Sequence, residues 1–318
     1  MLKTAFLFPG QGAQAVGMGR DLCEAFPAAA DLFDRAERAT GLELKKVCFE
    51  GPEEELARTD ISQPAIFTVS AAALATMEDL LGPKQWHAAR ATHVAGLSLG
   101  EYTALYAAGA MNFETGVTLV ARRGEVMQEA ATVVPSAMVC VLGLDEEQSG
   151  RLCQAAAQGQ VLTCANFNCP GQVVLSGQTE ACQRAADLAE EFGASGAVPL
   201  KVAGAFHSEL MRPAAEKLSE ALDRVSFGNL NCQVLSNVDG GLYANSGEIK
   251  DRLVRQLTHP VRWQRSMEKL LADGVETFYE IGPGRVLAGL MRRIDRRTRV
   301  VSLNGRRALA KLAGVSVS

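Results

Sequence analysis

The sequence predicts an α/β protein in which a large domain with a parallel sheet is interrupted by a smaller inserted domain. Three observations lead to this prediction: strand–turn–helix segments recur on both sides of the chain's middle, the middle itself has a β-α-β-β-α-β pattern, and no Pro/Ser-rich linker separates them. The large domain is therefore expected to be discontinuous, formed by residues 1–130 and 203–318, with residues 131–202 as the insertion.

Short apolar strands that end in glycine-containing turns define the large domain. We expect strands at Thr4–Phe8, His93–Gly96 and Thr277–Glu280, each followed by a turn and a helix. Repeated alternation of strand and helix indicates parallel strands covered by helices.

The insertion is predicted from its order of elements. Its expected strands and helices are Ala137–Leu142 (strand), Asp145–Gln158 (helix), Val161–Ala165 (strand), Gln172–Leu175 (strand, after a turn at 168–171), Thr179–Phe192 (helix) and Ala197–Val202 (strand). This is the order of the ferredoxin-like split motif.

Composition narrows the class of protein. The chain has 318 residues, 47% of them hydrophobic, and a net charge of −4, which suits a large core and argues against a general nucleic-acid binder. No apolar run of about 18 residues is evident, and Thr4–Phe8 is too short for a signal-peptide core, so we expect a cytoplasmic protein without a membrane span. The eight cysteines are scattered without Cys-x-x-Cys spacing, and no metal site is expected.

Ser98 is the candidate nucleophile. It lies in Gly96-Leu97-Ser98-Leu99-Gly100, a G-x-S-x-G sequence placed between a predicted strand and a predicted helix. There the glycines permit a tight turn, and the helix N-terminus favours a developing oxyanion. The alternative is a glycine-rich turn with a capping serine.

A serine nucleophile needs a base, and the chain has four histidines. His87 lies in a polar connection, His93 enters the strand too far from the serine, and His259 lies at a helix end. His207 remains, between the last strand of the insertion and a helix. The alternative is a histidine of the core.

Arg123 is expected to point inward. In a helix spanning residues 114–129 it shares a face with Leu119, Val120 and Met127. A buried guanidinium needs an anionic partner, because an unpaired buried charge is costly. That partner is either a carboxylate of the protein or one of the substrate, and the sequence leaves both open.

Two further features are weaker signals. Gln11 follows the first strand, at the edge where open α/β sheets place their sites. The basic run Arg292–Arg299 is either a solvated helix end or a docking surface for an acidic partner.

Several motifs together make the chain resemble the malonyl-CoA:acyl carrier protein transacylase family, which is related to the acyltransferase domains of polyketide synthases. They occur in the family's order along nearly the whole chain: Phe8-Pro9-Gly10-Gln11-Gly12, Ser62-Gln63-Pro64-Ala65, Gly96-Leu97-Ser98-Leu99-Gly100-Glu101-Tyr102, Arg123-Gly124, Asn166-Phe167-Asn168, Gly204-Ala205-Phe206-His207-Ser208, Pro260-Val261-Arg262-Trp263 and Glu280-Ile281-Gly282-Pro283-Gly284.

The resemblance implies an α/β-hydrolase-like large domain with a ferredoxin-like subdomain, and a transfer of malonyl from malonyl-CoA to the phosphopantetheine thiol of acyl carrier protein in fatty acid biosynthesis, without a metal or redox cofactor. The implied roles are Ser98 as nucleophile, His207 as base, Arg123 as clamp for the acyl carboxylate, Gln11 and the Leu99 amide as oxyanion hole, the Gln256 carbonyl as the group that orients the histidine, Gln63 and Asn166 as pocket residues, and Phe206 as a limit on α-branched donors.

One position departs from the family pattern, and three other functions stay open. Leu97 stands where the family more often has histidine, which affects local packing and donor preference. The alternatives are an acyltransferase of polyketide synthesis, a serine hydrolase or thioesterase, and a non-catalytic carrier-docking subunit. A hydrolase has no need for a buried arginine, and the intact Ser98 and His207 argue against a scaffold.

Overall fold

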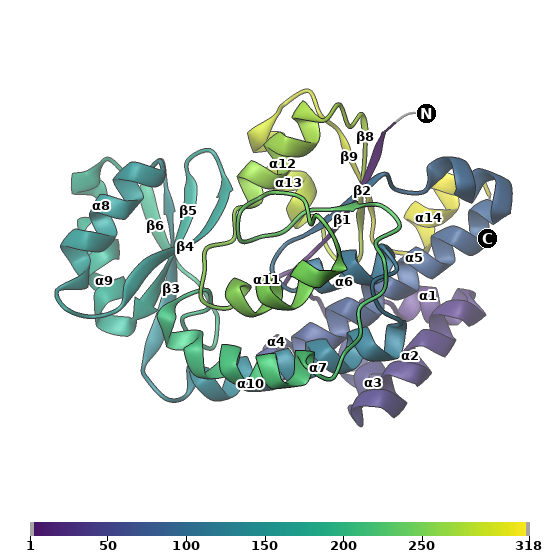
Figure 1. Cartoon of the computed structure of the whole chain (residues 1–318), viewed down its shortest axis with the longest axis horizontal. Helices are drawn as coiled ribbons and strands as arrows, with labels where there is room; N and C mark the ends of the chain where they lie inside the picture. Colours follow the sequence, from purple (N-terminus) through teal and green to yellow (C-terminus); the bar gives the residue numbers. More distant parts are fainter. Residues whose placement is uncertain (1–2, 316–318) are drawn as a thin grey trace.

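The computed structural model describes residues 3–315. It contains a five-stranded sheet and a four-stranded sheet, and these lie side by side with helices around them (Figure 1). The predicted fold class, an α/β domain with a small inserted subdomain, is confirmed.

The larger sheet is parallel throughout and has the order β7-β2-β1-β8-β9. Its strands are β1 (Thr4–Phe8), β2 (His93–Gly96), β7 (Gln233–Val234), β8 (Thr277–Ile281) and β9 (Val300–Leu303). Phe8 and Gly96 are paired at the carboxyl ends of β1 and β2, so the loops after these two strands begin next to each other.

Helices cover both faces of this sheet. They are α1 (Arg20–Ala25), α2 (Pro27–Thr40), α3 (Leu44–Glu50), α4 (Glu53–Ala57), α5 (Thr59–Ala89), α6 (Gly100–Ala107), α7 (Phe113–Ala131), α10 (Arg212–Leu222), α11 (Ile249–Gln256), α12 (Trp263–Ala272), α13 (Val286–Ile294) and α14 (Arg306–Ala313), with 3-10 turns η2 (Glu209–Met211) and η3 (Ser246–Glu248).

Alternation along β1 assigns its residues to two separate cores. Phe6 and Phe8 join the cluster formed with α2, α5, α6 and α7, whereas Ala5 and Leu7 join the cluster formed with α12 and α13. Because β1 is buried on both faces, all five of its residues are apolar or small, as expected of a central parallel strand.

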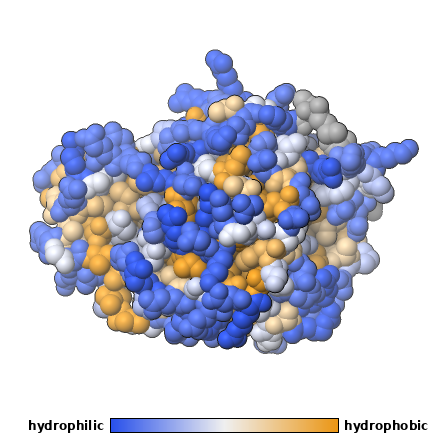
Figure 2. All heavy atoms as spheres, viewed as in Figure 1, coloured by the Kyte–Doolittle hydropathy of each residue, from blue (hydrophilic) through white to orange (hydrophobic). Residues whose placement is uncertain are grey.

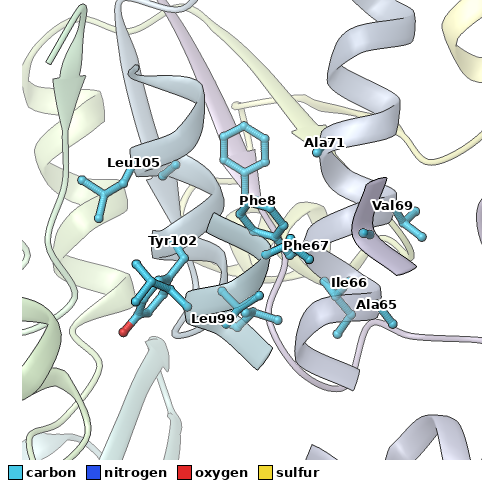
Figure 3. Packing of buried hydrophobic residues seen from close by; sticks show 14 of the residues in the cluster. Phe8, Ala65, Ile66, Phe67, Val69, Ala71, Leu99, Tyr102 and Leu105 are labelled. Atoms are coloured by element: carbon cyan, nitrogen blue, oxygen red, sulfur yellow. The ribbon is translucent and has the colours of Figure 1, made fainter. Parts of the chain in front are cut away.

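One helix has the length and composition of a membrane span, contrary to the sequence-based expectation that no segment does. It covers Thr59–His87 of α5, and 67% of its most apolar window is buried inside the protein. The helix packs against α2 and α7. Figure 3 shows Ile66 and Phe67 of this helix near Phe8 of β1 and Leu99 at the start of α6. It is a core helix of the large domain.

The inserted sheet has the order β4-β5-β3-β6 with antiparallel neighbours, the topology expected of a ferredoxin-like unit. Its elements are β3 (Ser136–Leu142), α8 (Glu146–Ala157), β4 (Leu162–Cys169), β5 (Gln172–Gln178), α9 (Thr179–Leu188), η1 (Ala189–Phe192) and β6 (Gly196–Pro199). In Figure 1 its two helices lie on the side away from the large domain.

Four predicted ends of elements in the insertion were wrong. Strand β5 runs on to Gln178, beyond the predicted end at Leu175. Strand β4 runs on to Cys169, which pairs with Gln172, so the turn is tighter than expected. Helix α9 gives way after Leu188 to the 3-10 turn η1. Strand β6 ends at Pro199, and residues 200–202 leave the sheet to line a cavity.

The surface on the side shown in Figure 2 is mainly hydrophilic, with separate apolar patches between the polar groups. The exposed large apolar side chains include Val198, Leu200 and Val286, of which Leu200 and Val286 border the cavity between the two sheets. The polar residues of that cavity are the candidate site.

Candidate active site

Ser98 lies in a sharp turn between β2 and α6, with a φ of 51° that non-glycine residues rarely adopt. The two flanking glycines are required by space. A Cβ atom on Gly96 would lie 1.8 Å from the Gly100 carbonyl carbon, and one on Gly100 would lie 2.1 Å from the Phe8 carbonyl oxygen. The G-x-S-x-G spacing therefore corresponds to a real elbow that is pressed against the end of β1.

The side chain of Asn237 stabilises this turn with two hydrogen bonds. Its Oδ1 accepts from the Ser98 amide at 2.6 Å, and its Nδ2 donates to the Gly96 carbonyl at 2.7 Å. Asn237 is only 1% exposed. Sequence analysis missed this residue, and no local pattern could have revealed it, because the contact joins positions 139 and 141 residues apart.

His207 contacts the serine directly. Its Nε2 lies 2.8 Å from Ser98 Oγ and its Nδ1 lies 2.7 Å from the Gln256 carbonyl oxygen. Since a carbonyl can only accept, Nδ1 carries the proton and Nε2 has the free lone pair that faces the hydroxyl. Burial, and then the charge of Arg123, lower the pKa of His207 to about 4. The ring is thus neutral at neutral pH, as a general base must be.

The other three histidines lie elsewhere, as the elimination required. His93 contacts Thr92 and has Asp273 at 3.9 Å, and His259 Nδ1 lies 2.9 Å from the Arg255 carbonyl at the end of α11. His87 is exposed near the end of α5.

Arg123 of α7 points into the interior and is 1% exposed. Its Nη1 donates to Gln63 Oε1 at 2.7 Å, and its Nη2 donates to Gln256 Oε1 at 2.9 Å and to Ser98 Oγ at 3.0 Å. Within residues 3–315 no carboxylate forms an ion pair with it, and its Nε has no hydrogen-bond partner. A structural ion pair, one of the two interpretations left open by the sequence, is therefore absent in the described chain.

Ser98, His207 and Arg123 border one cavity of about 330 Å³ between the two sheets. Gln11, Leu99, Asn166 and Phe206 line the same cavity, as does Leu97. The loops after β1 and β2, helix α7, and the insertion with the segment that follows it thus bring residues from positions 11 to 207 to a single site.

Gln63 is the exception among the predicted pocket residues. Its side chain is completely buried behind Arg123 and does not line the cavity. It can act on a bound molecule only through the guanidinium that it holds.

Gln11 and Leu99, the two residues expected to form an oxyanion hole, line the same cavity as Ser98. Gln11 lies in the turn after β1, and Leu99 begins α6. The turn after β1 packs closely against the serine turn at Gly10, where a Cβ atom would lie 2.3 Å from the Leu97 carbonyl oxygen. In the part of the chain that the structure describes, neither main-chain amide donates to a protein acceptor. Both remain available to a developing oxyanion.

Comparison with known proteins identifies the family of the chain. The acyl transferase domain family matches residues 5–303. The chain belongs to the acyl transferase family. Relatives in it include the malonyl CoA-acyl carrier protein transacylases of Bacillus subtilis (strain 168), 44% identical over 96% of this chain and 94% of the relative, and of Escherichia coli (strain K12), 42% identical over 98% of each.

Solved structures of the acyl transferase family have the same fold. The malonyl CoA-acyl carrier protein transacylase of Coxiella burnetii superposes with a TM-score of 0.93 at 37% identity, covering 98% of this chain and 97% of that one. A malonyl-transacylase in complex with a type II PKS acyl-carrier protein superposes with a TM-score of 0.92 at 40% identity, covering 98% and 99%.

The first prediction concerns the protonation of His207. Because burial depresses its pKa to about 4, the ring is expected to stay neutral as the pH is lowered from about 8 to about 5, whereas an exposed histidine titrates near 6.5. Histidine C2-proton NMR shifts measure this, with the His207 resonance assigned by its loss in His207→Asn. Titration of that resonance near pH 6.5 would contradict the burial argument.

Proposed function

We infer that this chain is a malonyl-CoA:acyl carrier protein S-malonyltransferase. The observation that carries the proposal is the position of Arg123. Its buried guanidinium lies 3.0 Å from the Oγ atom of Ser98, and no carboxylate of the described residues forms an ion pair with it. A planar fork beside the serine suits an acyl group that ends in a free carboxylate. Relatives across the full chain that carry the malonyl transacylase name support the same conclusion.

In the first half of the reaction Ser98 becomes acylated. His207 Nε2 takes the hydroxyl proton as Oγ attacks the thioester carbonyl, and the Gln11 and Leu99 amides stabilise the negative oxygen. Arg123 binds the malonyl carboxylate. As the tetrahedral intermediate collapses, the C–S bond breaks and His207 returns its proton to the leaving thiolate of coenzyme A.

The second half reverses these steps with a different thiol. The phosphopantetheine thiol of the carrier protein gives its proton to His207 and attacks the serine ester, and Ser98 leaves as the restored hydroxyl. The carbonyl of Gln256 holds the same tautomer of His207 in both halves. The proposed chemistry uses no metal or redox cofactor, and we place it in the cytoplasm, in fatty acid biosynthesis.

A carrier of polyketide synthesis is the second candidate partner. It is favoured by the likeness to a malonyl-transacylase in complex with a type II PKS acyl-carrier protein. Both functions share one reaction at Ser98, so transfer rates to purified carriers of the two kinds distinguish them. A hydrolase would instead release malonate from the acyl-enzyme in the absence of any thiol.

The second prediction tests the two reacting residues. Ser98→Ala is expected to abolish the malonyl adduct seen by intact-mass analysis, and His207→Ala to slow its formation by about 10²–10⁴-fold, the usual contribution of a general base. The matched control is His259→Ala, because His259 does not line the cavity and contacts the Arg255 carbonyl in α11 and the Thr258 hydroxyl. An unchanged rate in His207→Ala would show that another group removes the proton.

The third prediction tests the carboxylate clamp with two donors. Arg123→Ala is expected to weaken binding of the malonyl-CoA transition state by about 2–5 kcal/mol, because the donor's carboxylate is then buried without a partner. The loss is measured as a fall in kcat/KM for malonyl-CoA. Acetyl-CoA has no such carboxylate, so its kcat/KM is expected to change little or to rise.

The control for this prediction is the melting temperature of the same variant. A clamp predicts a changed donor ratio in a folded protein, whereas a purely structural arginine predicts parallel losses with both donors and a lower melting temperature. Arg122→Ala is the matched variant, since Arg122 lies next along the helix but pairs with Glu125 at the surface.

The fourth prediction concerns the basic run Arg292–Arg299, proposed as a docking surface for an acidic carrier. Arg292, Arg296 and Arg297 are exposed at and beyond the end of α13, whose Val286 and Leu290 line the cavity. Replacing the three arginines with alanine is expected to raise KM for the carrier and to weaken its salt dependence, with KM for malonyl-CoA unchanged. Equal effects on both substrates would identify the run as a solvated helix end.

A further inference from the structure

A buried carboxylate lies behind the active site and takes no direct part in the proposed reaction. Glu101, in the first turn of α6, is 0% exposed and does not line the cavity. No cationic side chain of residues 3–315 forms an ion pair with it. A buried carboxylate without a counter-ion is costly, so its hydrogen bonds must hold it in place.

Three donors from two segments, the loop after β7 and the end of α11, supply these bonds. Tyr243 Oη donates to Glu101 Oε1 at 2.5 Å. Two groups donate to Glu101 Oε2: Gln256 Nε2 at 2.6 Å and the main-chain amide of Asn237 at 3.2 Å. Two of these donors also contact the nucleophile turn. The Asn237 side chain accepts from the Ser98 amide, and Gln256 Nε2 donates to the Ser98 carbonyl at 3.0 Å.

The bond from Gln256 to Glu101 determines which end of the Gln256 amide faces Arg123. The carboxylate of Glu101 and the carbonyl of Ser98 are acceptors, so they require the NH₂ end of that amide. The oxygen end then points to Arg123 Nη2, a group that only donates, at 2.9 Å. A flipped amide would set two donors against each other and leave the acceptors unpaired.

We infer that Glu101 is a positioning residue for the acyl-carboxylate clamp, acting through the side-chain amide of Gln256. With Gln63, this amide fixes both Nη groups of Arg123, and so the direction of the guanidinium in the cavity. The inference rests on the proposed function, because it assigns to Arg123 the malonyl carboxylate. It predicts that a residue that does not line the cavity controls the choice between donors.

Two substitutions of Glu101 separate its hydrogen bonding from its charge. Glu101→Leu removes the acceptor and is expected to lower the malonyl-to-acetyl ratio of kcat/KM by about tenfold, since contacting residues couple at this scale. Glu101→Gln keeps an acceptor for Gln256 and the Asn237 amide, and its NH₂ can donate to Tyr243 Oη. This variant is expected to keep the donor ratio within about twofold of the wild type.

Tyr243→Phe is the matched control. It removes a hydrogen bond from the same carboxylate, but at Oε1, the oxygen that does not contact Gln256. It is expected to lower the melting temperature while leaving the donor ratio unchanged. Gln256→Met removes the amide but keeps the main-chain carbonyl that contacts His207, and it is expected to lower the ratio as Glu101→Leu does.

The double variant decides whether the effect passes through Gln256. Adding Glu101→Leu to Gln256→Met is expected to change the donor ratio no further. An unchanged ratio in Glu101→Leu, or a ratio in Glu101→Gln as low as in the leucine variant, would overturn the inference. If Glu101→Leu does not fold, an unchanged donor ratio in Gln256→Met is by itself enough to overturn the inference. Failure of the proposed function is a different result, a wild-type enzyme that forms no malonyl adduct.

Discussion

The serine held at a positive φ between β2 and α6 is the constraint on which the arrangement of the site depends. A side chain on Gly96 would overlap the Gly100 backbone, and one on Gly100 would overlap the Phe8 carbonyl, so the ends of β1 and β2 and the start of α6 can stay in contact only with glycine at both positions. The parallel pairing of β1 with β2 supplies that contact, and the Asn237 side chain closes the turn across residues 96 and 98. His207 has a positive φ as well, so both residues proposed to react occupy backbone conformations that the surrounding structure must maintain.

The site also buries three ionisable groups, which belong to one hydrogen-bond network. Arg123 and Glu101 are fully buried and His207 almost so, yet within residues 3–315 none of them has an ion pair with another side chain. Burial lowers the pKa of His207 and raises that of Glu101 to about 7. The side chain of Gln256 lies between the arginine and the carboxylate and bonds to each with a different end. Amide side chains thus occupy the positions that carboxylates would take in a salt bridge, and they leave the guanidinium without a directly paired anion among residues 3–315.

The inserted subdomain completes the cavity. It contributes Asn166 from β4, and the segment that leads from β6 back to the large domain carries Phe206 and His207. Strand β4 is tied to the large domain by the main-chain bridge between Asn166 and Val261, and Arg262 stacks on Phe167 at 4.5 Å from the ring centroid. These contacts fix the distance between a base that follows one sheet and a nucleophile that belongs to the other.

The sequence by itself determined the fold class, the elbow at Ser98 and the inward direction of Arg123, because each depends on local spacing or on helical periodicity. It also narrowed the histidines to His207 by elimination, since only four were available. It did not determine where Gln63 lies, how far β4 and β6 extend, or that α5 is a buried helix of membrane-span composition. Tertiary structure alone decided that Asn237, Glu101 and Gln256 share one network with the nucleophile. The physical reason is that hydrogen bonds between side chains more than a hundred residues apart leave no periodicity in the sequence, and they form only when folding has brought the strand ends and α11 together.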